Sequence, residues 1–121
     1  MKALIILAHG SRRKESNLEV QNLSNQVKKL TRKEFEIVDC AFLEVTKPSL
    51  IDLVEKIILK NVSEITVFPY FLNSGVHITT DIPNIIENAR AKHPSCKFIL
   101  CPPIGAYKNM PELVIKQLKS I

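Results

Sequence analysis

Apolar and polar positions follow two different periods along this chain, and segments of the two kinds alternate. Strands buried on both faces of a parallel sheet are expected where apolar residues run almost continuously, in residues 2–8, 35–43, 64–69 and 97–101. Amphipathic helices are expected where apolar residues recur three and four positions apart. These segments are residues 15–31, residues 48–60, a stretch beginning near Asp81, and residues 110–119. The pattern therefore predicts four strand–helix units in succession.

Three of the predicted helices show which side chains should face a sheet. These are Val20, Leu23, Val27 and Leu30 in the first, Leu50, Leu53, Val54, Ile57 and Ile58 in the second, and Ile82, Ile85, Ile86 and Ala89 in the third. Pro48 and Ser49 suit the first turn of the second helix. Asp81 is expected to cap the third helix, whose first turn tolerates Pro83.

Alternating strands and helices predict an α/β fold, with a four-stranded parallel sheet and helices on both faces. Right-handed crossovers restrict the topology, and we expect the strand order 2-1-3-4. In that order the first and third strands are neighbours at the point where the strand order reverses, and ligands bind at the carboxyl edge there. With 121 residues and no repeat or linker, residues 1–121 are expected to form a single domain.

Two histidines and a glutamate follow three of these strands at their carboxyl ends. His9 comes directly after the first strand, Glu44 after the second, and His77 in the segment that follows the third. Imidazole is a good ligand for Co²⁺, Ni²⁺, Fe²⁺ and Zn²⁺ and can accept a proton near neutral pH. A carboxylate can add an oxygen ligand or accept a proton. Each residue alone is compatible with an ordinary loop, but their joint placement favours a weak, open metal site.

Ser11, Arg12 and Arg13 lie near the start of the first helix, where backbone N–H groups and guanidinium groups can bind carboxylates. The formal net charge of +5 would attract an anionic small molecule or a nucleic acid. The lysines fall on polar helix faces without an aromatic platform, so we expect no nucleic-acid partner. The chain has no glycine-rich dinucleotide or phosphate-binding loop and no G-x-S-x-G elbow. The pair His9-Gly10 after the first strand also suggests a histidine phosphatase, but that chemistry would need an arginine where Ala8 stands.

The remaining features indicate the compartment. Cys40, Cys96 and Cys101 match no disulfide framework or zinc motif, so we interpret them as small apolar residues and assign them no metal. The first apolar run is too short for a signal peptide, and no stretch reaches the length of a membrane span. A cytoplasmic protein without a membrane partner is expected.

Three blocks of residues together resemble a known family, the small sirohydrochlorin chelatases, which are short class II chelatases of the cobalamin and siroheme pathways. The blocks are His9-Gly10-Ser11-Arg12, then Ala41-Phe42-Leu43-Glu44 with Pro48-Ser49, and then Pro69-Tyr70-Phe71-Leu72 with Gly75, His77 and Asp81-Ile82-Pro83. The resemblance runs in order from residue 2 to about residue 106.

The resemblance implies insertion of a divalent metal, with Co²⁺ the first choice and Fe²⁺ and Ni²⁺ open, into sirohydrochlorin or a close tetrapyrrole relative. No nucleotide and no permanently bound cofactor would be needed, because the metal is a substrate. His9 and His77 would bind the metal and accept pyrrole protons, with Glu44 assisting. Ser11 and Arg12 would lie near the carboxylates of the tetrapyrrole. The family also implies a homodimer.

A non-catalytic protein that carries a metal or a tetrapyrrole in the same site is the alternative. Metal binding without faster insertion would favour this carrier. The sequence does not choose among cobalt, iron and nickel, since all three suit imidazole and carboxylate ligands. Acid is expected to weaken metal binding, because a protonated imidazole is not a ligand.

Overall fold

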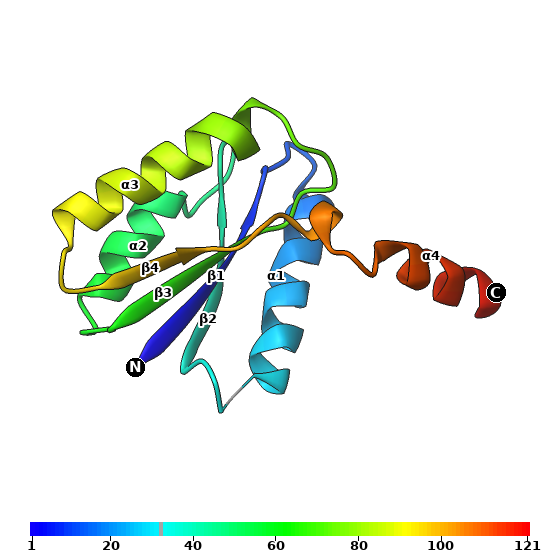
Figure 1. Cartoon of the computed structure of the whole chain (residues 1–121), viewed down its shortest axis with the longest axis horizontal. Coiled ribbons are helices and arrows are strands. Elements are labelled where there is room, and N and C mark those ends of the chain that lie inside the picture. The colour runs from blue at the N-terminus through cyan, green and yellow to red at the C-terminus, as the bar shows by residue number, and fades with distance from the viewer. Residues whose placement is uncertain (32) are drawn as a thin grey trace.

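Strands and helices alternate along the chain as the hydrophobic pattern predicts (Figure 1). The computed structural model describes residues 1–31 and 33–121. Its strands are β1 (Lys2–Ala8), β2 (Ile37–Phe42), β3 (Glu64–Pro69) and β4 (Lys97–Leu100). Its α-helices are α1 (Lys14–Leu30), α2 (Leu50–Ile58), α3 (Ile82–Lys92) and α4 (Met110–Lys119). Two short turns complete the fold: the π-helical turn η1 (His77–Asp81) and the 3₁₀ turn η2 (Ile104–Ala106).

The four strands form one parallel sheet in the order β2-β1-β3-β4, which confirms the predicted topology. The central strand β1 pairs with β2 up to Ala8 and Phe42, and with β3 up to Leu7 and Pro69. The carboxyl ends of these three strands therefore lie side by side. The loops that follow them start from the same edge of the sheet.

Helices cover both faces of the sheet, as predicted, with α2 and α3 on one side and α1 on the other (Figure 1). The α2–α3 side buries a large core that includes Ile5, Leu7, Leu53, Val54, Ile57, Ile65, Val67, Ile82 and Ile86. The α1 side buries a smaller one of Ile6, Ala8, Val20, Cys40 and Phe42. The expectation for Leu30 was wrong: it ends α1 with 86% of its surface exposed.

Two helix starts differ from the expectation. Pro48 and Ser49 precede α2 instead of forming its first turn, and the Ser49 hydroxyl accepts a hydrogen bond from the backbone N–H of Asp52 at 3.1 Å. Asp81 does not cap α3, because its own backbone is already helical and it ends the π-helical turn that runs into α3. Helical backbone before Ile82 removes the need for a side-chain cap there.

The last helix does not cover the sheet, although its predicted bounds are confirmed. No residue of α4 is buried, and the helix projects away from the rest of the chain (Figure 1). Among the described residues, no helix combines the length and the apolar character that crossing a bilayer requires.

Candidate metal centre

His9 is placed by the sheet itself. It is the first residue beyond β1, and the hydrogen bonding between β1 and β2 continues past both strands. The backbone N–H of Leu43 donates to the carbonyl of Ala8 at 3.0 Å, and that of Glu44 donates to the carbonyl of His9 at 3.1 Å. These two bonds set Glu44 against His9, although the residues are 35 positions apart.

Gly10 permits this close approach of the two loops. Its φ angle is +95°, a conformation that side-chain-bearing residues rarely adopt. A Cβ atom at this position would lie 1.9 Å from the carbonyl oxygen of Glu44. Only a residue without a side chain can therefore stand here while Glu44 stays beside His9.

The side chains of His9 and Glu44 also meet. The Nε2 atom of His9 lies 2.5 Å from Oε1 of Glu44, and both side chains are about half exposed. A hydrogen bond of this length between an imidazole and a carboxylate places one proton between the two atoms. The two atoms that would bind a cation therefore share one proton.

His77 reaches the same point by another route. It begins the π-helical turn η1, beyond the loop that follows β3. Its Nδ1 atom lies 2.8 Å from Oδ2 of Asp81, at the other end of that turn. The backbone N–H and the hydroxyl of Thr79 both contact the carbonyl of Gly75 at 2.9 Å, which closes the turn on its loop.

The three predicted residues come together in space. The imidazole rings of His9 and His77 are 5.0 Å apart between centroids, with an angle of 83° between their planes. One ligand atom each from His9, Glu44 and His77 lies within 4.8 Å of the others. Two nitrogen donors and one oxygen donor at this spacing can converge on one divalent cation. His9 and Glu44 are exposed and His77 is partly buried, so the other side of such a cation would stay open.

The two residues expected to bind substrate carboxylates are arranged differently from each other. Ser11 lines a hollow of about 280 Å³ beside His9, and its hydroxyl accepts a hydrogen bond from the backbone N–H of Arg13 at 3.0 Å. Asn17 holds this loop through hydrogen bonds to both backbone groups of Ser11. Arg12 is exposed and does not line the hollow.

Sequence reasoning missed the contact between Asp81 and His77. The two residues are four positions apart, a spacing that places side chains on one face of a helix. That spacing was visible in the sequence, but the segment before Asp81 was not predicted to be helical. Phe71 was not predicted as a neighbour of the site either; its ring centroid lies 6.3 Å from that of His9.

The three cysteines are not among the residues of this cluster. All three are free thiols, and Cys40 and Cys96 are buried. Burial, with a smaller contribution from the charge of Asp39, raises the pKa of Cys40 to about 11. Burial also raises the pKa of Cys101. Thiols with raised pKa values are poor metal ligands, because the thiolate is the form that binds.

A parallel α/β sheet with two histidines and a carboxylate at its carboxyl edge places the chain in a class of proteins whose residues can converge on a divalent metal. The sequence matches the CbiX family over residues 3–121. The chain belongs to the CbiX family.

Two relatives illustrate the similarity in sequence. The chain is 31% identical over 111 residues to the chloroplastic sirohydrochlorin ferrochelatase of Arabidopsis thaliana, covering 92% of this chain and 48% of that protein. It is 27% identical over 121 residues to the sirohydrochlorin cobaltochelatase of Sulfurisphaera tokodaii, covering 100% of this chain and 94% of the relative. The chain thus spans about half of the plant relative and nearly all of the archaeal one.

The fold is also similar to a solved chelatase structure. The sirohydrochlorin chelatase SirB from Bacillus subtilis subspecies spizizenii, in complex with cobalt, matches with a TM-score of 0.83 and 26% identity. The match covers 99% of this chain and 50% of the SirB chain. This similarity supports the chelatase-like fold expected from the sequence.

Proposed function

We propose that this chain inserts a divalent metal ion into sirohydrochlorin or a closely related tetrapyrrole, without a nucleotide. The convergence of His9, Glu44 and His77 within 4.8 Å carries the proposal. The relatives support the same substrate, since they are a sirohydrochlorin ferrochelatase and a sirohydrochlorin cobaltochelatase. Co²⁺ is our first choice of metal, with Fe²⁺ and Ni²⁺ as the other candidates.

Three ligands suit a metal that must leave again. Imidazole nitrogen and carboxylate oxygen bind Co²⁺, Fe²⁺ and Ni²⁺, and water would fill the other positions. The half-exposed side chains of His9 and Glu44 leave room for a planar macrocycle to approach the ion. In this mechanism the site holds the metal until the pyrrole nitrogens replace the protein ligands.

The pair of His9 and Glu44 can accept one of the protons that the reaction releases. Insertion of M²⁺ forms bonds to the macrocycle nitrogens and releases two pyrrole protons. A cation bound by His9 and Glu44 takes the place of the proton shared between them. When the cation leaves, the pair can accept one pyrrole proton, and His77 or water accepts the second. Metal and proton thus exchange places at one pair of atoms.

The rim of the site suits a substrate with several carboxylates. The free hydrogen of the Ser11 hydroxyl can donate to a carboxylate, because the oxygen already accepts from Arg13. Arg12 is exposed nearby in sequence and offers a guanidinium group to the same substrate. We assign both residues to substrate binding.

The test is an anaerobic absorbance assay of sirohydrochlorin metallation with Co²⁺, Fe²⁺ and Ni²⁺ in turn. His9→Ala and His77→Ala are each expected to lose most of the acceleration that the unaltered protein gives. His93→Ala is the matched control, because this third histidine ends α3 and bonds to Glu55 away from the site. No acceleration with any metal would overturn the proposal. Tight Co²⁺ binding in that case would favour the carrier alternative.

We also propose that the protein acts as a homodimer in which α4 of each copy packs on the other. Four apolar side chains of α4, Leu113, Val114, Ile115 and Leu118, are 45–60% exposed. A ten-residue helix is barely stable in water unless it packs against another surface. An apolar helix face of this kind therefore needs a partner.

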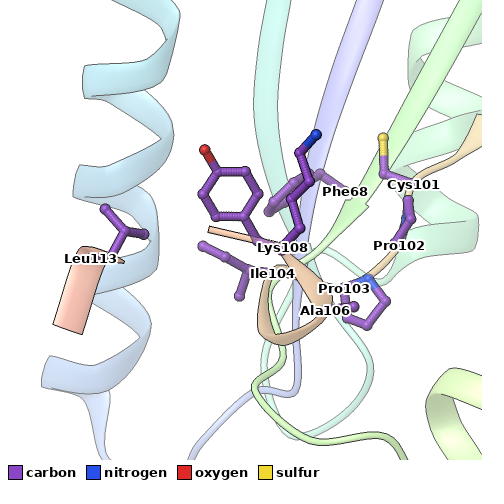
Figure 2. Close-up of a pocket in the computed structure, with 9 residues that line it drawn as sticks. Phe68, Cys101, Pro102, Pro103, Ile104, Ala106, Lys108 and Leu113 are labelled. Atoms are coloured by element: carbon purple, nitrogen blue, oxygen red, sulfur yellow. The ribbon is translucent and has the colours of Figure 1, made fainter. Parts of the chain in front are cut away.

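A suitable surface lies on the α1 face of the sheet, in the part that α1 does not cover. A hollow of about 660 Å³ there is lined by Phe68 of β3, Cys101 and Ile104, with Leu113 at its border (Figure 2). The lining is mostly apolar and so matches the face of α4. In a dimer with twofold symmetry, α4 of each copy would lie in the hollow of the other copy, so the same contact would form twice.

The oligomeric state tests this proposal. The unaltered protein is expected to sediment as a dimer at micromolar concentration, and Leu118→Asp as a monomer. Lys116→Asp introduces the same residue on the charged face of α4, which also carries Glu112 and Lys119, and is expected to stay dimeric. A monomeric unaltered protein, or dimers of Leu118→Asp as stable as those of Lys116→Asp, would overturn the proposed packing of α4 on the other copy.

A further inference from the structure

We propose that Asp81 is a positioning residue that makes Nε2 of His77 the atom that holds the metal. The inference rests on the proposed function, in which His77 is a metal ligand. Asp81 Oδ2 lies 2.8 Å from Nδ1 of His77, so the carboxylate accepts a hydrogen bond from Nδ1–H. A neutral imidazole that carries its proton on Nδ1 has an unprotonated Nε2. Asp81 therefore selects the tautomer that can bind a cation through Nε2.

The π-helical turn is what makes this contact possible. His77 and Asp81 begin and end that turn, and the backbone N–H of Ile82 donates to the carbonyl of His77. Both side chains project from the same side of one turn, four positions apart. A π-helical turn of this kind is rare and occurs frequently at functional sites. The turn thus fixes the imidazole relative to α3 rather than leaving it on a loose loop.

Within residues 1–31 and 33–121, the contact with His77 is the side-chain contact that the Asp81 carboxylate makes. The carboxylate does not cap α3, because the backbone at Asp81 is helical with φ −66° and ψ −50°. Carboxylates that accept a hydrogen bond from a metal-binding histidine orient the ring and increase its basicity, and their removal typically weakens metal binding about 10–100-fold.

Two measurements besides activity test the assignment. The Co²⁺ affinity of the protein is measured by titration of its visible absorbance, and the tautomer of His77 by long-range ¹⁵N–¹H NMR. Asp81→Ala is expected to weaken Co²⁺ binding about 10–100-fold and to give a mixture of tautomers. Asp81→Asn keeps an oxygen acceptor for Nδ1–H and is expected to fall between Asp81→Ala and the unaltered protein. Glu87→Gln is the control, because this α3 carboxylate pairs with Arg90.

A double-mutant cycle distinguishes positioning from a general loss of structure. If Asp81 acts only through His77, Asp81→Ala has no further effect on Co²⁺ affinity once His77 is alanine. An equal loss in both backgrounds, or an unchanged affinity and tautomer in Asp81→Ala, would overturn the proposal. If Asp81→Ala does not fold, the comparison of Asp81→Asn with Glu87→Gln carries the test. Failure of the unaltered protein to metallate sirohydrochlorin would reject the function, not the positioning.

Discussion

The two histidines of the candidate metal centre are held by different kinds of structure. His9 stands one residue beyond β1, and backbone hydrogen bonds of the extended sheet set it against Glu44. His77 stands beyond a loop, in a π-helical turn, and its ring is held by the side chain of Asp81. One half of the site therefore depends on long-range strand register, and the other on local helix geometry. A shift of the backbone should therefore displace His9 relative to Glu44, whereas a change of the Asp81 side chain should release the ring of His77.

Gly10→Ala is the substitution with the largest expected effect, because it acts on the sheet-held half. The new Cβ would lie 1.9 Å from the carbonyl oxygen of Glu44, and the φ angle of +95° adds about 1–3 kcal/mol of backbone strain. We expect lower stability to urea and loss of both Co²⁺ binding and metallation. Gly75→Ala is the matched control in the His77 loop, where a Cβ would meet nothing within 4 Å. Equal effects of the two substitutions would contradict the idea that backbone geometry holds His9 more strictly than His77.

Glu44→Gln is expected to rank second. Glutamine keeps the size of the side chain but removes its charge and its ability to accept a proton. Loss of a proton acceptor typically slows a reaction about 10²–10⁴-fold, and the loss here should appear in the kcat of metallation. Asp81→Asn should cost less, because Asp81 acts only through His77 whereas Glu44 contacts the reacting atoms in the proposed mechanism. A larger effect of Asp81→Asn would reverse the roles that we assign to the two carboxylates.

The sheet-held half of the site was predictable from the sequence, and the helix-held half only in part. Apolar runs indicated β1, β2 and β3, and the handedness of crossovers indicated their order. Once the order is known, His9 and Glu44 are expected at the same edge of the sheet, since both follow paired strands. His77 could be assigned only to the same crevice. Its position depends on how the segment after β3 folds, and no hydrophobic period specifies a π-helical turn.

The last helix shows a second limit of sequence reasoning. The apolar spacing predicted the bounds of α4 correctly, because local periodicity determines a helix. Periodicity does not tell which surface an apolar face covers. For α2 the surface is the chain's own sheet, whereas for α4 no residue is buried in the single chain. Amphipathic helices can thus differ in whether the single chain supplies the surface that their apolar face covers.

The smallest effect is expected from a substitution that acts at the carboxyl end of α3, the end opposite His77 and Asp81. It tests whether metal binding at the amino end of this helix depends on contacts at its carboxyl end. Hydrogen bonds from Lys92, and then from His93, lower the pKa of Glu55 below its usual value of 4.5. A carboxyl group with a lowered pKa in the folded state stabilises the protein above its unfolded pKa, and this contribution is lost as the pH falls through the folded pKa. Glu55→Gln should therefore be slightly less stable than the unaltered protein at about pH 7, and in urea unfolding the difference should shrink as the pH falls through the lowered pKa of Glu55. Its Co²⁺ affinity should not change, because Glu55 contacts His93 and Lys92, not His77. A changed affinity would mean that α3 transmits strain from one end to the other, and that Asp81 alone does not hold His77.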